Sequence, residues 1–195
     1  MAAPTGKRPQ PMLVVVTGAP ASGKTTLGRL LAVALCLPLL SLDRVKESLH
    51  DALGGAAPTR LELRLAAEAV VVGLLGDSAT GAVLDIWLDP SRDDRDRLRG
   101  GLPPDLLVRE IYCDAPAEVA VRRYSDRVRH GPHLPPDLEV LARIRAAVEL
   151  MAEGSSSAPR GLGPVLRVDT SQEVVVPDLV RWLTAGSETV RRVEN

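Results

Sequence analysis

Hydrophobic and polar positions follow two different periods along the chain. The Val-rich apolar run at residues 12–17 (MLVVVT) is closed by Gly18, which is the pattern of a buried strand. From Leu27 to Leu35 the apolar residues instead recur at i, i+3, i+4, i+7 and i+8, the spacing of one apolar helix face. The chain is therefore predicted to open with a strand, a glycine-rich loop and a helix.

The same alternation continues along the rest of the chain. Further strands are predicted at residues 37–42, 82–88, 106–113 and 165–169. Helices are predicted at residues 45–53, 59–75, 138–151 and 177–183, with one more starting from the Pro and acidic residues at 114–118. Strands that alternate with helical crossovers favour a parallel sheet covered on both faces, with ligands beyond the carboxyl ends of its strands.

Length and composition limit the class of protein. The 195 residues fit one domain, predicted to span residues 12–185 with a lid around 122–137, between disordered tails at 1–11 and 186–195. A net charge of -1 with 45% apolar residues argues against a nucleic-acid coat and against a disordered chain. The longest apolar run is broken by Pro38 and the N-terminus lacks a signal-peptide core, so we expect a cytoplasmic protein without a membrane partner.

The chain has only two cysteines, Cys36 and Cys113, with no CxxC motif and no His at ligand spacing from either. Neither a disulfide framework nor a zinc site at these residues is expected, and both are predicted to be core thiols. His130 and His133 are expected to be surface residues of the lid loop, with a ligand role as the alternative.

The segment from Gly18 to Thr25 (GAPASGKT) matches GxxxxGK[ST] and lies between a predicted strand and a predicted helix, as the motif requires. Glycines let backbone N–H groups turn inward around phosphates, and the helix N-terminus adds partial positive charge. Lys24 is expected to reach the β- and γ-phosphates, and the Thr25 hydroxyl to ligate Mg²⁺. An ordinary glycine turn explains neither side chain. The predicted nucleotide-binding residues of this loop are Gly18, Ala19, Pro20, Ala21, Ser22, Gly23, Lys24, Thr25 and Thr26.

Other sequence features indicate which class of phosphate-loop protein this is. It has no guanine-reading NKxD, which argues against a Ras-type GTPase, and its short length favours a kinase. The chain resembles the small P-loop kinases, which include shikimate kinase, chloramphenicol phosphotransferase, polynucleotide kinase and the zeta toxins. The resemblance runs from Met12 to Leu183 and rests on the glycine loop, the Asp after the second strand and two lid arginines. It implies an α/β three-layer fold with a five-stranded parallel sheet of order 2-3-1-4-5, and the use of ATP or GTP with Mg²⁺.

Asp43 follows the second predicted strand, where the resembling families carry an Asp that takes or orients the acceptor hydroxyl. The segment SLDRVK resembles the Asp-x-x-Arg of polynucleotide kinase, with Lys46 in the last position. A carboxylate that faces the γ-phosphate can accept the proton of the acceptor and hold it in line. The alternative is that Asp43 caps a helix starting at Arg44. Lys46 is either a substrate or phosphate contact or part of a solvated helix face.

The third predicted strand carries an acidic residue, Asp85, in VLDIW. It resembles the acid that these families hold on the third strand, which implies that it faces the Mg²⁺ water shell or Thr25; a hydrogen bond to the glycine loop is the alternative. Trp87 and Asp89 follow at the strand end. Trp87 is a candidate substrate platform, with core packing as the alternative, and Asp89 is a candidate substrate contact.

The stretch RRYSDRVRH resembles the lid helix of small kinases and places Arg123 and Arg127 four residues apart on one helix face. The resemblance implies that Arg123 packs near the base and that Arg127 reaches the transferring phosphate as a catalytic residue, whereas a solvated basic face is the alternative. Asp169 and Thr170, after the last strand, are expected to wrap the base without deciding between ATP and GTP. Arg60, like its neighbour Arg64, either binds an anionic substrate or faces solvent.

Together these residues predict a Mg²⁺-dependent kinase that moves the γ-phosphoryl group of ATP or GTP to a hydroxyl of a small molecule. An Arg-, Ala- and Val-rich composition without Phe is typical of a high-GC bacterial genome. With the resemblance to chloramphenicol phosphotransferase, it suggests an antibiotic acceptor and self-resistance. A metabolic sugar, nucleoside, nucleotide or shikimate-like acid kinase is the alternative. A nucleotide-sensing protein without catalysis would explain the glycine loop but leave Asp43 and the lid arginines without a task.

Overall fold

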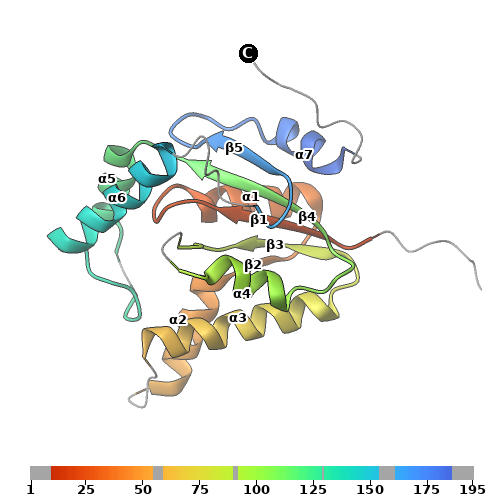
Figure 1. Ribbon diagram of the computed structural model, residues 1–195, viewed down its shortest axis with the longest axis horizontal. Helices are drawn as coiled ribbons and strands as arrows, with labels where there is room; N and C mark the ends of the chain where they lie inside the picture. Colours follow the sequence, from red (N-terminus) through yellow and green to blue (C-terminus); the bar gives the residue numbers. More distant parts are fainter. Residues whose placement is uncertain (1–9, 55–58, 90–91, 129, 154–160, 186–195) are drawn as a thin grey trace, which may run out of the picture.

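The computed structural model describes residues 10–54, 59–89, 92–128, 130–153 and 161–185. Its centre is a five-stranded sheet in the order β2-β3-β1-β4-β5, in which every neighbouring pair is parallel (Figure 1). The predicted α/β fold and the predicted strand order are confirmed. The strands are β1 (Met12–Thr17), β2 (Leu39–Ser41), β3 (Gly81–Asp85), β4 (Leu107–Asp114) and β5 (Val165–Asp169).

Helices connect these strands and cover both faces of the sheet. They are α1 (Lys24–Leu35), α2 (Leu42–Leu53), α3 (Arg60–Asp77), α4 (Asp94–Gly101), α5 (Ala117–Asp126), α6 (Leu138–Glu153) and α7 (Val176–Thr184). None of the helices in the described part of the chain is long and apolar enough to cross a membrane. The predicted tails fall almost wholly on residues 1–9 and 186–195, outside the described residues.

β1 is the central strand, paired with β3 on one side and β4 on the other. Its apolar run is continuous rather than alternating because both faces of the sheet are covered. Val14, Val15 and Val16 are all fully buried. The strand therefore delivers Thr17 and Gly18 to the middle of the carboxyl edge of the sheet.

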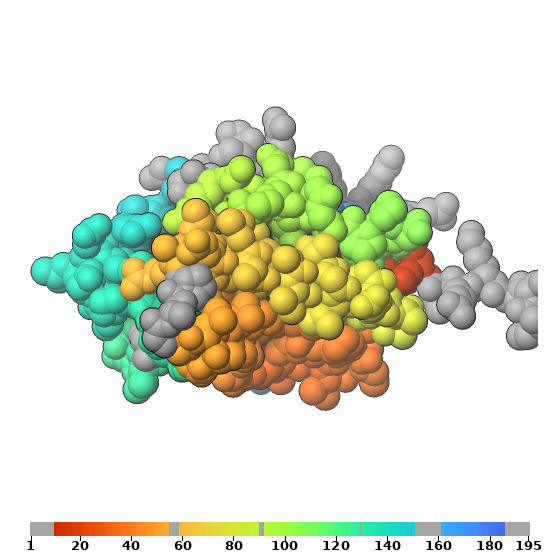
Figure 2. Space-filling model, turned by 90° about the horizontal axis from the view of Figure 1, so that it is seen from below, coloured from red at the N-terminus to blue at the C-terminus, as the bar shows by residue number. Residues whose placement is uncertain are grey.

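Helices α2, α3 and α4 cover one face of the sheet. Leu42 of α2, Val71 of α3 and Leu98 of α4 belong to one buried cluster with Leu13 and Leu84 of the strands. Figure 2 looks onto this side of the molecule, where α3 runs across the surface and the cyan residues of α6 project beyond one end. A capping box fixes the start of α3, because Thr59 Oγ1 accepts from the Glu62 N–H and Glu62 accepts from the Thr59 N–H.

Helices α1 and α7 cover the opposite face. Leu27 and Leu31 of α1 and Leu183 of α7 pack with Val83 in a second buried cluster, and the predicted core residue Trp182 packs against it. A third cluster joins α5 and α6 beyond the carboxyl ends of the strands, as the arrowheads in Figure 1 show. This third cluster includes Ala19 of the glycine loop, so the α5–α6 pair is seated directly on that loop.

Two expectations from the sequence differ from the structure. Helix α4 was not predicted, because its sequence DRDRLRGG is almost wholly polar and only Leu98 supplies a buried apolar side chain. Cys113 is buried as predicted, but Cys36 is exposed, so the interpretation of Cys36 as a core thiol is wrong. Cys36 follows the last turn of α1 with a left-handed backbone conformation (φ 53°), which carries its side chain away from the buried helix face.

Candidate active site

A cleft of about 1160 Å³ lies at the carboxyl edge of the sheet. Its walls come from the glycine loop, the starts of α2 and α3, the end of β3, helices α5 and α6, and the turn after β5. Of the residues predicted for the site, those lining the cleft are Pro20, Ala21, Gly23, Lys24, Thr25, Thr26, Asp43, Lys46, Arg60, Asp85, Trp87, Asp89, Arg123, Arg127 and Thr170. Four predicted residues do not line it: Gly18, Ala19, Ser22 and Asp169.

The glycine loop takes backbone conformations that few other residues adopt. Gly18 has φ 135°, Ala21 has φ 63° and Gly23 has φ 94°. A Cβ at Gly18 would lie 2.6 Å from Ser22 Oγ, so this position has no room for a side chain. Ser22 Oγ is buried and has no hydrogen-bond partner among the described residues. Such a turn is the type of backbone concavity that binds anions.

Lys24 is the first residue of α1 and is only 9% exposed. Its Nζ donates to the Ala19 carbonyl oxygen at 2.6 Å, so the side chain closes back over its own loop. Burial lowers the pKa of Lys24 below its ordinary value, and Arg127 acts in the same direction, whereas the charges of Asp85 and Asp43 oppose the shift. An anion in the loop would restore the charge balance around this ammonium group.

Thr25 and Asp85 meet at the base of the cleft. Thr25 Oγ1 donates to Asp85 Oδ2 at 2.7 Å, and Ser41 Oγ donates to the same oxygen at 3.2 Å. Asp85 is 5% exposed, and a buried carboxylate is tolerated because it accepts these hydrogen bonds. Sequence reasoning paired Thr25 with Asp85 but missed Ser41, whose position at the end of β2 and directly before Leu42 was the available signal.

Asp43 lies in the first turn of α2, which begins at Leu42 rather than at residue 45. The N-cap residue is Ser41, so the alternative interpretation of Asp43 as the helix cap is wrong. The side chain is 61% exposed toward the cleft, and its Oδ1 lies 3.4 Å from Lys46 Nζ. Desolvation raises the pKa of Asp43, but the charges of Lys46, His133 and Lys24 outweigh it and hold the pKa below its ordinary value. Asp43 is therefore ionised at neutral pH.

The two lid arginines do not share a helix face. Helix α5 ends at Asp126, and Arg127 follows it with an extended backbone (ψ 126°), so the predicted i, i+4 arrangement is wrong. Arg123 Nη2 donates to the Thr170 carbonyl oxygen at 3.0 Å. Thr170 Oγ1 in turn contacts the Ser22 carbonyl oxygen at 2.5 Å, which links β5, α5 and the glycine loop. Arg127 is exposed and lines the cleft from the lid side.

Asp169 is turned away from the cleft. Its Oδ1 accepts from the Ser171 N–H at 2.8 Å and from Ser171 Oγ at 2.6 Å, which closes the turn after β5. These hydrogen bonds hold the pKa of Asp169 below its ordinary value. Thr170, rather than Asp169, is the residue that this turn presents to the cleft.

The cleft is lined by both paired and unpaired arginines. Arg64 is buried and occupied, because it contacts Glu68 at 2.7 Å, Asp94 at 3.1 Å and the Trp87 carbonyl oxygen at 2.8 Å. The solvent-facing role weighed for Arg64 is therefore wrong, whereas substrate binding stays a prediction, because Arg64 also lines the cleft. Arg60 and Arg143 line the cleft from α3 and α6, but neither forms an ion pair or hydrogen bond with another described residue.

Trp87 and Asp89 follow β3 along the floor of the cleft. Trp87 is half-buried, packs against the α5–α6 cluster and has its ring centroid 5.9 Å from Lys24 Nζ. The core-packing alternative therefore holds in part, and the role of Trp87 as a substrate platform stays a prediction. Asp89 lies 3.6 Å from Arg92 Nε. Sequence reasoning missed Arg143, because a single Arg in an amphipathic helix carries no signal of the surface that it faces.

Residues 13–151 match the AAA domain family. The chain belongs to this family. No protein of curated function matches it significantly. A candidate kinase from Chloroflexus aurantiacus is 29% identical, with a TM-score of 0.66 over 90% of this chain and 97% of the other.

Two further solved structures share the fold at lower identity. Shikimate kinase from Acinetobacter baumannii, in complex with shikimate, is 18% identical, with a TM-score of 0.62 over 93% of this chain and 96% of the other. A gluconokinase from Sinorhizobium meliloti is 22% identical, with a TM-score of 0.52 over 90% and 91%. The predicted resemblance to the small P-loop kinases is thereby confirmed, and the protein has a kinase-like P-loop fold.

Proposed function

We propose that the protein is a Mg²⁺-dependent kinase that transfers the γ-phosphoryl group of ATP or GTP to a hydroxyl group of a small anionic molecule. The observation that carries this proposal is the arrangement of three groups in one cleft: Lys24 at the glycine loop, the Thr25–Asp85 pair beneath it, and ionised Asp43 facing both from α2. A purely nucleotide-binding protein has no use for the third group.

The residues of the cleft fit a nucleotide with Mg²⁺. The hydroxyls of Thr25 and Ser41 and the carboxylate of Asp85 are the oxygen donors that this hard cation prefers, directly or through water. Bound Mg²⁺ supplies neutralisation of the phosphate charge. The positive-φ glycine loop fits the phosphates themselves.

Lys24, Arg123 and Arg127 are the cations that would bind the nucleotide and neutralise its phosphate charge. Lys24 Nζ exchanges its hydrogen bond with the Ala19 carbonyl for one with a phosphate oxygen, which costs little because one acceptor replaces another. Arg123 is held by Thr170 beside the loop and serves nucleotide binding. Arg127 lies past the end of α5, where a small backbone movement brings it to the charge that develops during transfer.

Asp43 orients the acceptor hydroxyl and receives its proton on a carboxylate oxygen as the new O–P bond forms. The bond between the γ-phosphorus and the β,γ-bridging oxygen breaks in the same step, and nucleoside diphosphate leaves. Its depressed pKa makes it a weak base. That suits a loose transition state, in which the proton leaves the acceptor late and positioning contributes more than basicity. Lys46, 3.4 Å away and mostly buried, holds the carboxylate in its ionised form.

The acceptor class follows from the two unpaired arginines. Arg60 and Arg143 line the same cleft as Asp43 without a carboxylate partner among the described residues. An anionic substituent on the acceptor would satisfy them, and Arg is suited to bidentate binding of a carboxylate or phosphate. A hydroxylated acid therefore fits better than a neutral antibiotic or sugar. One structurally similar kinase is described in complex with shikimate, which is a hydroxylated acid.

The test is a transfer screen with ATP and with GTP. Each hydroxylated carboxylic acid or sugar phosphate is paired with its neutral counterpart, and hydroxylated antibiotics form a separate group; products are detected by the mass gain of one phosphoryl group. We expect phosphorylated product from acids and not from their neutral counterparts. Transfer only to antibiotics or neutral sugars would overturn the acceptor class, and nucleotide binding without transfer to any acceptor would favour a sensor.

A further inference from the structure

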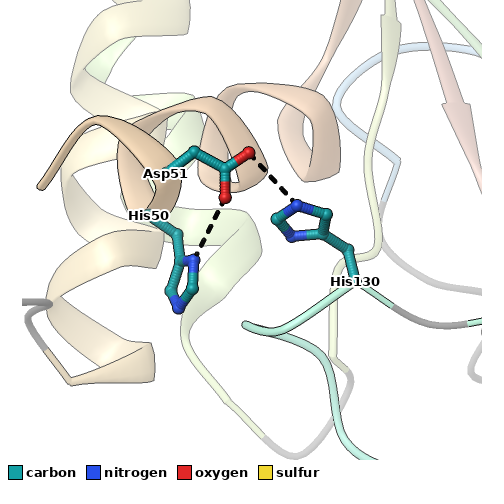
Figure 3. Close-up of side chains that lie close together, drawn as sticks. All are labelled: His50, Asp51 and His130. Atoms are coloured by element: carbon teal, nitrogen blue, oxygen red, sulfur yellow. Dashed lines mark hydrogen bonds and ion pairs between the residues drawn. The ribbon is translucent and has the colours of Figure 1, made fainter. Parts of the chain in front are cut away.

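The three histidines of the chain all lie where the segment after α5 meets α2. Figure 3 shows His50 and Asp51 on α2 and His130 reaching toward them from the segment after α5. His130 Nε2 lies 3.2 Å from Asp51 Oδ2, and His50 Nδ1 lies 3.4 Å from Asp51 Oδ1. One ligand-capable atom from each residue can be chosen so that all lie within 4.8 Å of one another.

These separations fit a tetrahedral ion. Zn²⁺ binds imidazole nitrogen and carboxylate oxygen at about 2.0–2.2 Å, which places neighbouring donor atoms about 3.4 Å apart at tetrahedral angles. Both nitrogen-to-oxygen distances are close to that value, but they run to different oxygens of the Asp51 carboxylate, so an ion bound through one oxygen requires a small rotation of these side chains. The imidazole rings of His50 and His130 meet edge to face, with centroids 5.8 Å apart, so neither ring stacks over the nitrogen of the other.

We propose that His50, Asp51 and His130 form a binding site for a divalent transition ion of the Zn²⁺ type, completed by water. The side chains of His50 and His130 are 33% and 37% exposed, which leaves an open position for the water ligand. Two imidazoles and one carboxylate select Zn²⁺, Ni²⁺ or Cu²⁺ over Mg²⁺. The site is therefore chemically different from the all-oxygen group around Asp85.

Hydrogen bonding from two neutral imidazoles to Asp51 is the alternative explanation of these contacts. One carboxylate can accept from two neutral imidazoles, but two protonated rings would place two positive charges against a single negative one. An ion uses the unprotonated nitrogens of both rings and the carboxylate together. No cysteine takes part, because Cys113 is buried elsewhere and Cys36 follows α1 on the other side of the sheet.

A bound ion would join two elements that face the cleft. Helix α2 begins beside Asp43 and carries Lys46, whereas the segment that contains His130 begins at Arg127. The contact between His133 Nε2 and Glu47 Oε1, at 3.0 Å, lies along the same boundary between these elements. The ion would hold the segment from residue 130 onward against α2 at the edge of the cleft.

The test measures metal binding without any catalytic assay. Full-length, tag-free protein without nucleotide is dialysed against Zn²⁺ in the presence of excess Mg²⁺, and bound zinc is measured by elemental analysis. We expect saturable binding of one ion per chain and a zinc-dependent rise in melting temperature, because an ion bound only by the folded form stabilises it.

Three variants locate the ion. His50→Ala and His130→Gln should each weaken Zn²⁺ binding by at least about tenfold. His133→Gln is the matched control, because this residue lies in the same segment and contacts α2 without belonging to the group, and it should bind Zn²⁺ like wild type. The two histidines are partly exposed, so both variants should fold, which far-UV circular dichroism checks.

A second measurement reports on the segment that contains His130. Zn²⁺ should slow amide hydrogen exchange at Gly131, His133 and Leu134 in wild type and not in His130→Gln; the other residues from 131 to 136 are prolines without an amide hydrogen. The proposal is wrong if wild type binds no zinc saturably, or if His50→Ala and His130→Gln bind it as wild type does. Either result leaves the proposed kinase activity untouched, because no step of that proposal involves these residues.

Discussion

Thr25 Oγ1 lies 2.7 Å from Asp85 Oδ2, although the two residues are 60 positions apart in the chain. The sheet order creates this contact: β3 lies between β1 and β2, so the end of β3 comes beneath the helix that follows the glycine loop. The parallel register places Ser41 opposite Asp85, which brings a second hydroxyl to the same carboxylate. The strand order 2-3-1-4-5 thus assembles the proposed Mg²⁺ ligands from three separate segments.

Replacing Lys24 by Ala should reduce phosphoryl transfer by at least about 10²-fold, because the variant loses a preorganised cation at the phosphates. The fold should persist, since the variant loses only one hydrogen bond, to Ala19, worth about 1 kcal/mol. Initial transfer rates and thermal unfolding on one preparation check both statements. Wild-type turnover in this variant would contradict the role of the glycine loop.

Asp43→Asn should lower transfer by about 10²- to 10⁴-fold, the usual contribution of a positioned acid or base. Nucleotide affinity and melting temperature should change little, because Asp43 faces the acceptor, is largely exposed and does not cap α2. Lys46→Met is an informative companion, since it leaves Asp43 in place and removes its nearest cation. Normal transfer in Asp43→Asn would require a different residue to orient the acceptor.

Arg123→Ala and Arg127→Ala should fail in different ways. Arg123 is tied to Thr170 beside the glycine loop, so its loss should chiefly weaken nucleotide binding. Arg127 is exposed beyond the end of α5 and should lower the transfer rate more than the affinity. Titration of nucleotide binding and the maximal transfer rate separate the two effects. Equal, small effects from both would mean that these residues form only a solvated basic surface.

The two cysteines should react at very different rates with an alkylating agent at neutral pH. Burial raises the pKa of Cys113 from 9.0 to about 12, which lowers its thiolate fraction by about 10³-fold, whereas Cys36 is exposed. A raised pKa favours the neutral, unreactive thiol of Cys113 at every pH below that pKa. Peptide mass mapping of the folded protein should show modification of Cys36 alone, with Cys113 modified only after denaturation.

Asp94→Ala should destabilise the protein by about 3 kcal/mol, because it removes a buried carboxylate that Arg64 and Arg97 share and leaves Glu68 as the remaining buried carboxylate beside both guanidinium groups. Asp94 is 1% exposed and contacts Arg97 Nη2 at 2.7 Å and Arg64 Nη2 at 3.1 Å. The neighbouring Asp96→Ala is the control, since its carboxylate is exposed and lies 3.4 Å from Arg99. Urea unfolding should show a change of about 0.5 kcal/mol or less for the control.

The fold was predictable because its strongest signals are local. The apolar run of β1, the glycine loop and the apolar face of α1 follow one another in the sequence. Each of these patterns predicts its own secondary structure without information from distant residues. Helix α4 escaped prediction because its stability comes from distant partners: Arg95 binds Glu110 of β4 at 2.8 Å, and Arg97 binds Glu68 of α3 at 2.7 Å. Such ion pairs leave no periodic pattern in the sequence.

The candidate site was predictable to the same degree. Lys24, Thr25 and Asp85 follow from motif and strand position, whereas Arg143 and Ser41 enter the site only through tertiary packing. The placement of Arg127 was wrong because an apolar period does not reveal where a helix ends, and the first Gly after it is Gly131. Where tertiary contacts decide the end of a helix, the hydrophobic period of the sequence does not predict it.

Phosphoryl transfer from the nucleotide to an acceptor is tested by comparing the amounts of its two products, phosphorylated acceptor and nucleoside diphosphate. Wild-type protein, ATP or GTP, Mg²⁺ and the best acceptor acid are incubated together, and phosphorylated acceptor and nucleoside diphosphate are both quantified over time. If the protein transfers the γ-phosphoryl group as proposed, wild type should form equal amounts of the two products. Lys24→Ala and Asp43→Asn should form neither product. Nucleoside diphosphate that forms at the same rate without an acceptor, with no acceptor phosphorylated, would contradict the proposed transfer.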